Sequence, residues 1–155
     1  MYDVTIKTLP AMAVVALRHV GPYDTIGEAF QRLMAWGRER GLVGPETRRF
    51  AIYHDDPAAV PAERLRSDAS FAAPAGFVPE GDFRLETIAG GRHAVLIHKG
   101  PYADLDRPYR WLYRTWLPAS GEAPAERPPF DESLNNPTSL PPSDWLTAIH
   151  LPLKG

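Results

Sequence analysis

The 155-residue chain lacks cysteine, an excess of positive charge and long apolar runs. Without cysteine it can form no disulfide, no Cys-ligated zinc site and no thiol nucleophile, which fits a reducing compartment. Seventeen Lys and Arg residues against 19 Asp and Glu give a net charge of −2, so we expect no direct contact with nucleic acid. The apolar runs have strand length and the first residues do not resemble a signal peptide. We therefore expect a cytoplasmic location and no membrane association.

The string His-x-Gly-Pro-Tyr occurs twice, at residues 19–23 and 98–102, and the two copies are 79 positions apart (98 − 19 = 79). The same offset, which later grows by one, aligns further identical residues: Thr8 with Thr87, Leu17 with Leu96, Leu33 with Leu112, Phe50 with Phe130, and Pro57 with Pro137. Such internal similarity indicates a duplication. We expect one domain over residues 1–155, made of repeat one (1–78) and repeat two (79–155), with a pocket at their seam.

Hydrophobic periodicity predicts the order strand, strand, helix, strand, strand in both repeats. In repeat one, two adjacent strands over residues 4–8 and 13–19 are closed by a turn at Gly21-Pro22. A helix follows to about residue 41, with Thr25 and Glu28 as a capping box. Strands are then expected over residues 49–54 and 65–72. The paired acids Asp55-Asp56 precede a proline and are interpreted as turn residues, not as metal ligands.

Repeat two is expected to form strands over residues 83–87 and 94–98, a helix from about residue 104, and strands over 129–135 and 145–151. Its helix carries an apolar stripe that ends at Pro118, and the stripe consists of Leu105, Tyr109, Leu112 and Trp116. The predicted fold class is α+β, an internal duplication of a strand-strand-helix-strand-strand unit. Two helices pack on antiparallel sheet, with a central cleft.

Several aromatic and histidine residues lie at positions that invite a functional interpretation. His19 and His98 are in phase with the apolar residues of their strands, so a structural role at the turn is favoured, and no metal site is expected. Tyr23 and Tyr102 could line a cleft or cap the core. Trp111 points away from the helical stripe, and Tyr113 lies on its shoulder. Either Trp111 contacts the other repeat or a loop, or it stacks on a ligand; the same question applies to Trp36.

Two acids, Asp131 and Glu132, fall inside a predicted strand, where carboxylates are poor strand formers. Strand alternation places Phe130, Glu132 and Leu134 on one face and Asp131 and Ser133 on the other. Exposure to solvent on one face of this strand would explain only one of the two acids. The other acid is therefore expected to point into the cleft. Burial there would raise its pKa unless a cation pairs with it.

Several motifs together resemble the GyrI-like small-molecule-binding domains over nearly the whole chain. They are Leu9-Pro10, the paired His-x-Gly-Pro-Tyr, Tyr-His-Asp-Asp-Pro at 53–57, Trp111 to Pro118, Leu134-Asn-Asn-Pro137 and the closing Ile149-His-Leu-Pro-Leu153. That family includes effector-binding halves of bacterial transcription regulators, stand-alone proteins named for DNA gyrase inhibition, and relatives reported to hydrolyse cyclopropane-bearing natural products. No helix-turn-helix pattern precedes Val4 or follows Leu153, so the resemblance implies a stand-alone member.

The family typically places a Glu on the penultimate strand, in a pattern resembling Phe-Glu-x-Tyr-Leu-Asn. Here the Glu position is occupied by Asp131 and the Tyr position by Ser133. Either Asp131 takes the role of the Glu, or Glu132 takes it after a register slip. The resemblance implies an aromatic cleft that binds an amphipathic, aromatic or cationic small molecule without cofactor or metal. The expected ligand-binding residues are Asp131, Glu132, Trp111, Tyr113, Tyr102, Tyr23, Tyr53 and Trp36.

Two alternatives to ligand binding remain open at this point. The first is hydrolysis of reactive cyclopropane-type molecules, with Asp131 or Glu132 handling water and Tyr113 protonating the leaving oxygen. The second is inhibition of a protein partner such as gyrase. A transcription regulator is a further possible partner, and the chain is expected to be a monomer or a homodimer.

Overall fold

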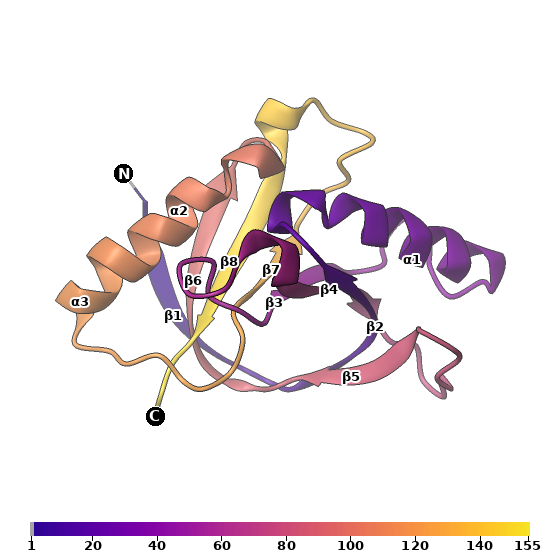
Figure 1. Cartoon of the computed structure of the whole chain (residues 1–155), viewed down its shortest axis with the longest axis horizontal. Helices are drawn as coiled ribbons and strands as arrows, with labels where there is room; N and C mark the ends of the chain where they lie inside the picture. The colour runs from indigo at the N-terminus through magenta and orange to yellow at the C-terminus, as the bar shows by residue number, and fades with distance from the viewer. Residues whose placement is uncertain (1) are drawn as a thin grey trace. The chain divides into compact units, whose positions relative to one another are not determined.

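The computed structural model describes residues 2–155 and divides the chain into two compact units (Figure 1). One unit is Ala11–Ala89; the other consists of the segment up to Pro10 together with Gly90–Gly155. Each unit carries antiparallel strands and helical segments. The predicted α+β class is therefore confirmed.

In the part of the chain that the structure describes, every helix falls short of the length and apolar character that crossing a membrane requires.

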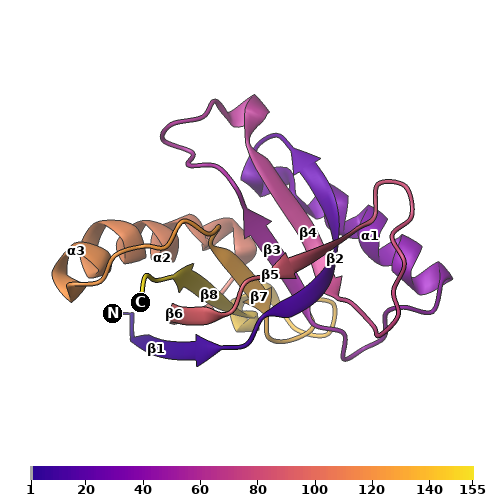
Figure 2. The same cartoon turned by 90° about the horizontal axis from the view of Figure 1, so that it is seen from below.

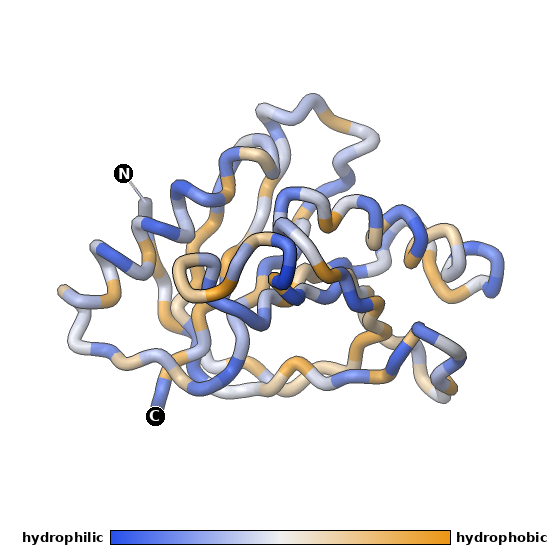
Figure 3. Tube along the Cα trace, viewed as in Figure 1, coloured by the Kyte–Doolittle hydropathy of each residue, from blue (hydrophilic) through white to orange (hydrophobic). Residues whose placement is uncertain are grey.

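The Ala11–Ala89 unit is an antiparallel sheet with one long helix. Its elements are β2 (Met12–Val20), α1 (Gly27–Glu39), β3 (Arg49–Tyr53), β4 (Arg66–Ala72) and β5 (Arg84–Ile88). Neighbouring strands follow the order β3-β4-β2-β5, and Figure 2 shows β5 running beside β2. The apolar stripe of α1 faces one side of this sheet, and its polar side gives the alternating colours along the helix in Figure 3.

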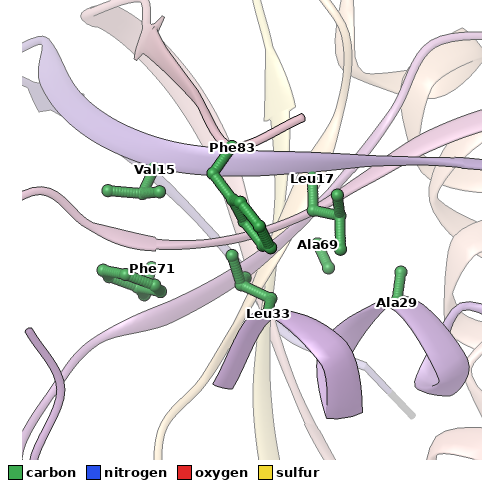
Figure 4. Packing of buried hydrophobic residues seen from close by; sticks show 7 residues of the cluster. All are labelled: Val15, Leu17, Ala29, Leu33, Ala69, Phe71 and Phe83. Atoms are coloured by element: carbon green, nitrogen blue, oxygen red, sulfur yellow. The ribbon is translucent and has the colours of Figure 1, made fainter. Parts of the chain in front are cut away.

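The core of this unit lies between α1 and the sheet (Figure 4). Leu33 on α1 and Phe71 on β4 are fully buried, and Phe83, just before β5, packs into the same cluster. Gly37 is the point of closest approach, because a Cβ there would lie 2.9 Å from Val43 Cγ1 and 3.2 Å from Phe71 Cε2. The predicted helical stripe thus packs as the periodicity indicated.

The other unit has the same kind of construction. Its elements are β1 (Val4–Leu9), β6 (Gly91–Lys99), α2 (Asp106–Trp111), α3 (Leu117–Ser120), β7 (Phe130–Ser133) and β8 (Leu146–Pro152). A π-helical segment, Leu112–Trp116, joins α2 to α3. The strand order is β1-β6-β8-β7, all antiparallel. Leu96, Leu112 and Ile149 are fully buried at the centre of its core.

The order strand, helix, strand, strand recurs in both units, as β2-α1-β3-β4 and as β6-α2-β7-β8. The doubled Gly-Pro occupies equivalent turns. The Gly21 amide donates to the Leu65 carbonyl at 2.8 Å, and the Gly100 amide donates to the Trp145 carbonyl at 2.8 Å. Both glycines have positive φ, 137° and 142°, which explains why glycine is needed there.

The first strand of each predicted repeat pairs with a strand that the sequence did not suggest as its neighbour. β1 pairs with β6, where Val4 faces Leu96, and β5 pairs with β2, where Leu85 faces Val15. The strands over residues 4–8 and 13–19, predicted to be adjacent, lie in different units. Alternation specifies which face of a strand is buried, but it does not specify the neighbouring strand.

The predicted capping box at the start of the first helix is wrong. Tyr23–Thr25 form a 3-10 turn, and the helical N-cap is Ile26, which makes no side-chain capping bond. The Thr25 hydroxyl instead donates to the Pro22 carbonyl at 2.8 Å and lies 2.8 Å from His19 Nε2. Because the chain is already helical at Thr25, its side chain cannot adopt the non-helical N-cap position.

The second helical region also ends later than the sequence predicted. Pro108 sits in the first turn of α2, as expected, but the helix continues past Pro118 to Ser120 and ends at Gly121, with φ 77°. Pro118 has no amide hydrogen for the carbonyl one turn back. It lies just after the π-helical segment Leu112–Trp116, in which the i→i+4 ladder is already interrupted.

Candidate functional site

Asp131 on β7 is buried beneath α2. Its carboxylate accepts a hydrogen bond from the Tyr109 hydroxyl at 2.9 Å, and it pairs across the sheet with Ile149 of the core. Only 6% of Asp131 is exposed. The sequence placed Tyr109 on the core stripe of the helix, and the structure shows that its polar end binds one of the two candidate acids.

On the same sheet face as Asp131, two residues further along β7, a row of polar side chains crosses the sheet. Ser133 on β7 faces Thr147 on β8, which faces His98 on β6. The Ser133 hydroxyl lies 2.9 Å from the Tyr102 hydroxyl. Within residues 2–155, Thr147 Oγ1 and His98 Nε2 are buried without a hydrogen-bond partner. Buried polar atoms are normally satisfied, so this row has unused capacity for a water or a ligand group.

Glu132 lies on the opposite face of β7, as strand alternation requires. It pairs with Ala148 and is 9% exposed. On that face Phe130 stacks on His150, with ring centroids 4.5 Å apart, and His150 Nδ1 lies 3.2 Å from His93 Nδ1. The two acids therefore occupy different environments, and Asp131 is the one that shares a face with Tyr109 and the polar row.

The structure does not bring Trp111 and Tyr113 to Asp131 through any contact that it describes. Trp111 packs against the hydrophobic core, with its ring 5.2 Å from that of Tyr2. The expectation that Trp111 points away from the core is thus wrong. The Trp111 ring packs against another part of the chain. Tyr113 is 37% exposed on the π-helical segment. The Tyr109 hydroxyl donates a hydrogen bond to Asp131.

Tyr23 and Tyr53 belong to the Ala11–Ala89 unit, where their rings pack 4.8 Å apart. The Tyr23 hydroxyl donates to the Asp55 carbonyl at 2.6 Å and accepts from the Asp55 amide at 2.9 Å. Burial raises the pKa of Tyr23, opposed by its hydrogen bond to the Asp55 backbone. Tyr23 therefore holds the turn that follows β3.

Trp36 lies on α1 at the edge of a surface hollow of about 300 Å³, which Arg40, Phe77 and Glu80 also line. Its indole stacks on Phe83 at 4.0 Å, donates to Glu80 at 3.3 Å, and is covered by the Arg40 guanidinium at 4.6 Å. A second hollow, of about 520 Å³, is lined by polar and basic groups near β6 and the end of the chain. Neither hollow is lined by Asp131 or Glu132.

The remaining sequence interpretations concern turns and metals. Asp56 accepts from the Ala58 amide at 2.9 Å and Asn136 accepts from the Thr138 amide at 3.0 Å, so both positions are turn residues, as predicted. His19 holds the turn after β2 through Thr25. Among residues 2–155, no group of three or more His, Asp or Glu side chains is arranged to hold a metal ion.

Sequence reasoning missed a further buried carboxylate, Asp68 on β4. It is bonded by Arg18, His54 and Arg84. Its position inside a strand, two residues after Arg66, carried the same signal as Asp131: an acid in a segment that otherwise alternates toward a core.

The sequence pattern of the GyrI-like small molecule binding domain matches residues 2–154. A DNA gyrase inhibitor of Serratia proteamaculans is 37% identical over 139 residues, which cover 86% of this chain and 87% of that protein. A DNA gyrase inhibitor of Edwardsiella piscicida is 33% identical over 157 residues, covering 98% of both chains.

Solved structures share the fold. The EcmrR C-terminal domain superposes with a TM-score of 0.85 at 20% identity, over 99% of this chain and 98% of that domain. In the EcmrR–DNA complex, this chain covers 57% of the EcmrR chain. A structure of SAV2435 bound to tetraphenylphosphonium superposes with a TM-score of 0.67 at 13% identity, over 99% of this chain and 94% of that one. By sequence and by fold, the chain belongs to the GyrI-like small-molecule-binding domain family.

Proposed function

We propose that this chain binds an amphipathic, aromatic, cationic small molecule, with Asp131 supplying the negative charge. The observation that carries the proposal is the burial of the Asp131 carboxylate beneath α2, next to a row of polar groups with unused hydrogen-bonding capacity. Burying a carboxylate costs free energy unless a cation or hydrogen bonds compensate it. A cationic ligand next to this carboxylate contributes a favourable charge contact together with apolar surface.

The aromatic part of such a ligand has partners on the same unit. Tyr102 presents its ring at the start of the helical region and leans on Trp145, with centroids 4.6 Å apart. Tyr109 contributes both a ring and a hydroxyl beside Asp131. Aromatic faces attract cations, and the attraction grows when water is excluded. Placement of the ligand at a seam between the repeats stays a prediction of the sequence.

Tetraphenylphosphonium is a suitable probe, because the structural neighbour SAV2435 was solved with it bound. We expect saturable binding by isothermal titration calorimetry. Asp131→Asn keeps the size of the side chain and should weaken binding by about tenfold or more, since a charge-assisted contact is lost. Glu132→Gln removes the same charge from the next residue, on the opposite face, and should leave the affinity within about twofold.

No heat of binding with the wild-type chain would contradict the proposal. Equal losses in the two variants would also contradict it, because they would show a general charge effect and not a role of Asp131. Circular dichroism of both variants provides the check that each remains folded.

A second function, inhibition of DNA gyrase, is favoured by the sequence relatives, which are named DNA gyrase inhibitors. We propose that the folded chain lowers the supercoiling activity of purified gyrase in a dose-dependent way. A gel assay with relaxed plasmid tests this. Unchanged supercoiling at a large molar excess of the chain would exclude it. Because this test contains no tetraphenylphosphonium, its outcome is independent of the titration above.

A further inference from the structure

The hollow of about 520 Å³ near the start of β6 is formed by four chain segments of one unit. The end of β1 pairs with the start of β6, where Thr8 faces Arg92. The segment after α3 runs beside the chain that follows β8, because the Lys154 amide donates to the Ala123 carbonyl at 2.9 Å. Strand pairing and backbone hydrogen bonds therefore fix the walls of this hollow.

Three basic side chains line the hollow, and they are Arg92, Arg127 and Lys154. The charge of Arg92 is balanced by Glu122, because each terminal nitrogen of the guanidinium contacts one oxygen of that carboxylate at 3.0 Å. In the part of the chain that the structure describes, no carboxylate forms an ion pair with Arg127 or Lys154. The lining of the hollow thus contains two positive charges without a paired counter-charge.

Arg127 is held by two main-chain carbonyls. Its Nη1 donates to the Gly90 carbonyl, and its Nη2 donates to the Leu153 carbonyl at 3.4 Å. A Cβ at Gly91 would lie 3.0 Å from Arg127 Nη1, so the glycine leaves room for the guanidinium against the backbone. The two bonds use two of the five donor hydrogens, and among residues 2–155 the buried Nε has no hydrogen-bond partner. An anion in the hollow would compensate the charge that the carbonyls only partly satisfy.

Two of these basic residues correspond to uncharged residues in the other unit. By the sequence offset, Arg92 corresponds to Ala13 (92 − 13 = 79) and Lys154 to Pro74 (154 − 74 = 80). The backbone agrees with this correspondence, because the carbonyls of Arg92 and Ala13 each accept, at 2.9 Å, an amide hydrogen from the residue that follows the last strand of their sheet pair, β8 or β4. The same local pairing therefore forms without basic side chains, so the strand pairing does not require these charges.

We propose that this hollow binds the phosphate group of a small molecule, with Arg127 and Lys154 supplying the positive charge. A phosphate monoester carries close to two negative charges at neutral pH, which matches the two unpaired cations. Guanidinium and ammonium groups form charge-assisted hydrogen bonds with phosphate oxygens. A volume of about 520 Å³ is typical of small-molecule sites, and it leaves room for an organic group beyond the phosphate.

This phosphate site is separate from the Asp131 site proposed above. Asp131 faces Ile149 across the sheet, and Ile149 in turn faces Leu96 on β6. Arg92 lies four positions before Leu96 on the same strand (96 − 92 = 4), which is roughly 13 Å at the rise of a β-strand. One site attracts a cation and the other an anion, so either proposal can fail without the other.

Inorganic phosphate is the probe, at about pH 8, where a phosphate group carries nearly two negative charges. We expect the NMR resonances of the Arg127 side chain and the Gly91 amide to shift saturably with sodium phosphate, but not with sodium chloride at equal ionic strength. Phenyl phosphate should shift the same resonances. Acetate carries one charge and should bind about tenfold more weakly than phosphate. Lys154→Gln should weaken phosphate binding by about tenfold, and Arg127→Gln should abolish it.

Lys99→Gln and Arg110→Gln are the matched controls. Lys99 is an exposed lysine at the opposite end of β6, and Arg110 is an exposed arginine on α2, so each variant removes one positive charge of the same unit outside the hollow. Both should bind phosphate as the wild type does. Unchanged binding by Lys154→Gln, shifts that chloride reproduces, acetate binding as tight as phosphate binding, or exclusion of phenyl phosphate would each overturn the proposal. If Arg127→Gln does not fold, the comparison of Lys154→Gln with Lys99→Gln decides the question.

Discussion

Asp68 is held ionised by its neighbours. Burial raises the pKa of this carboxyl, but the hydrogen bonds from His54, Arg18 and Arg84 outweigh burial and hold the pKa well below its usual range. A carboxyl whose pKa is depressed by folding stabilises the folded state above its unfolded pKa, about 3.9, and loses that contribution as the pH falls. The chain should therefore lose stability as the pH falls below about 4.

Asp68→Asn should lower the free energy of unfolding at pH 7 by about 3 kcal/mol, because Arg18 and Arg84 lose their buried counter-charge. Urea unfolding at pH 7 and pH 3 measures this, and the difference between wild type and variant should shrink at pH 3. Asp106→Asn removes an exposed acid that pairs with Arg110 one helical turn away, and should change stability by less than about 0.5 kcal/mol. A constant difference at both pH values would contradict the assignment.

At the scale of elements, the two faces of each strand could be predicted from the sequence, and the neighbours of each strand could not. Periodicity located the helix stripe containing Leu33 and separated Asp131 from Glu132. It could not show that β1 joins β6, because any strand with the same alternation satisfies that face equally. The hydrogen bond from Tyr109 to Asp131 could not be predicted for a related reason. A helical stripe indicates that the Tyr109 ring is buried, but it does not indicate which group the hydroxyl binds.

Helix α1 offers a direct test of its packing against β4. Gly37→Ala should destabilise the chain by about 1–3 kcal/mol, although alanine favours helix, because the added methyl meets Val43 and Phe71. Gly27→Ala, at the start of the same helix, meets nothing within 4 Å and should be neutral or slightly stabilising. Thermal unfolding of the two variants distinguishes these effects. A gain in stability from Gly37→Ala would show that the helix can move away from the sheet.

For the whole molecule, the compact units and the sequence repeats are offset along the chain. The predicted repeats divide after residue 78, whereas the compact units divide after Pro10 and again after Ala89. We propose that both units are copies of one repeat whose first strands have changed places. This offset could not be predicted from the sequence. The boundary of a repeat is found from sequence similarity, whereas the boundary of a compact unit depends on contacts between residues far apart in the chain.

This arrangement predicts which fragments fold. A peptide of residues 11–89 contains β5 and Phe83, so its sheet and core are complete, and it should unfold cooperatively in urea. A peptide of residues 1–78 has nearly the same length but lacks β5 and Phe83, and it carries β1 without β6. We expect it to show no cooperative transition, because small domains have little stability to lose. Cooperative unfolding of residues 1–78, and not of 11–89, would reverse the assignment.

The pairing of β1 with β6 also determines when β1 can pair during synthesis of the chain. Val4 faces Leu96, 92 positions later (96 − 4 = 92), so during synthesis the first strand leaves the ribosome well before its partner exists. At about 5–20 residues per second, the Ala11–Ala89 segment is completed while β1 waits roughly 5–20 s for β6. During this interval β1 is an unpaired strand edge, and a chaperone that binds nascent chains has its longest opportunity at residues 4–9.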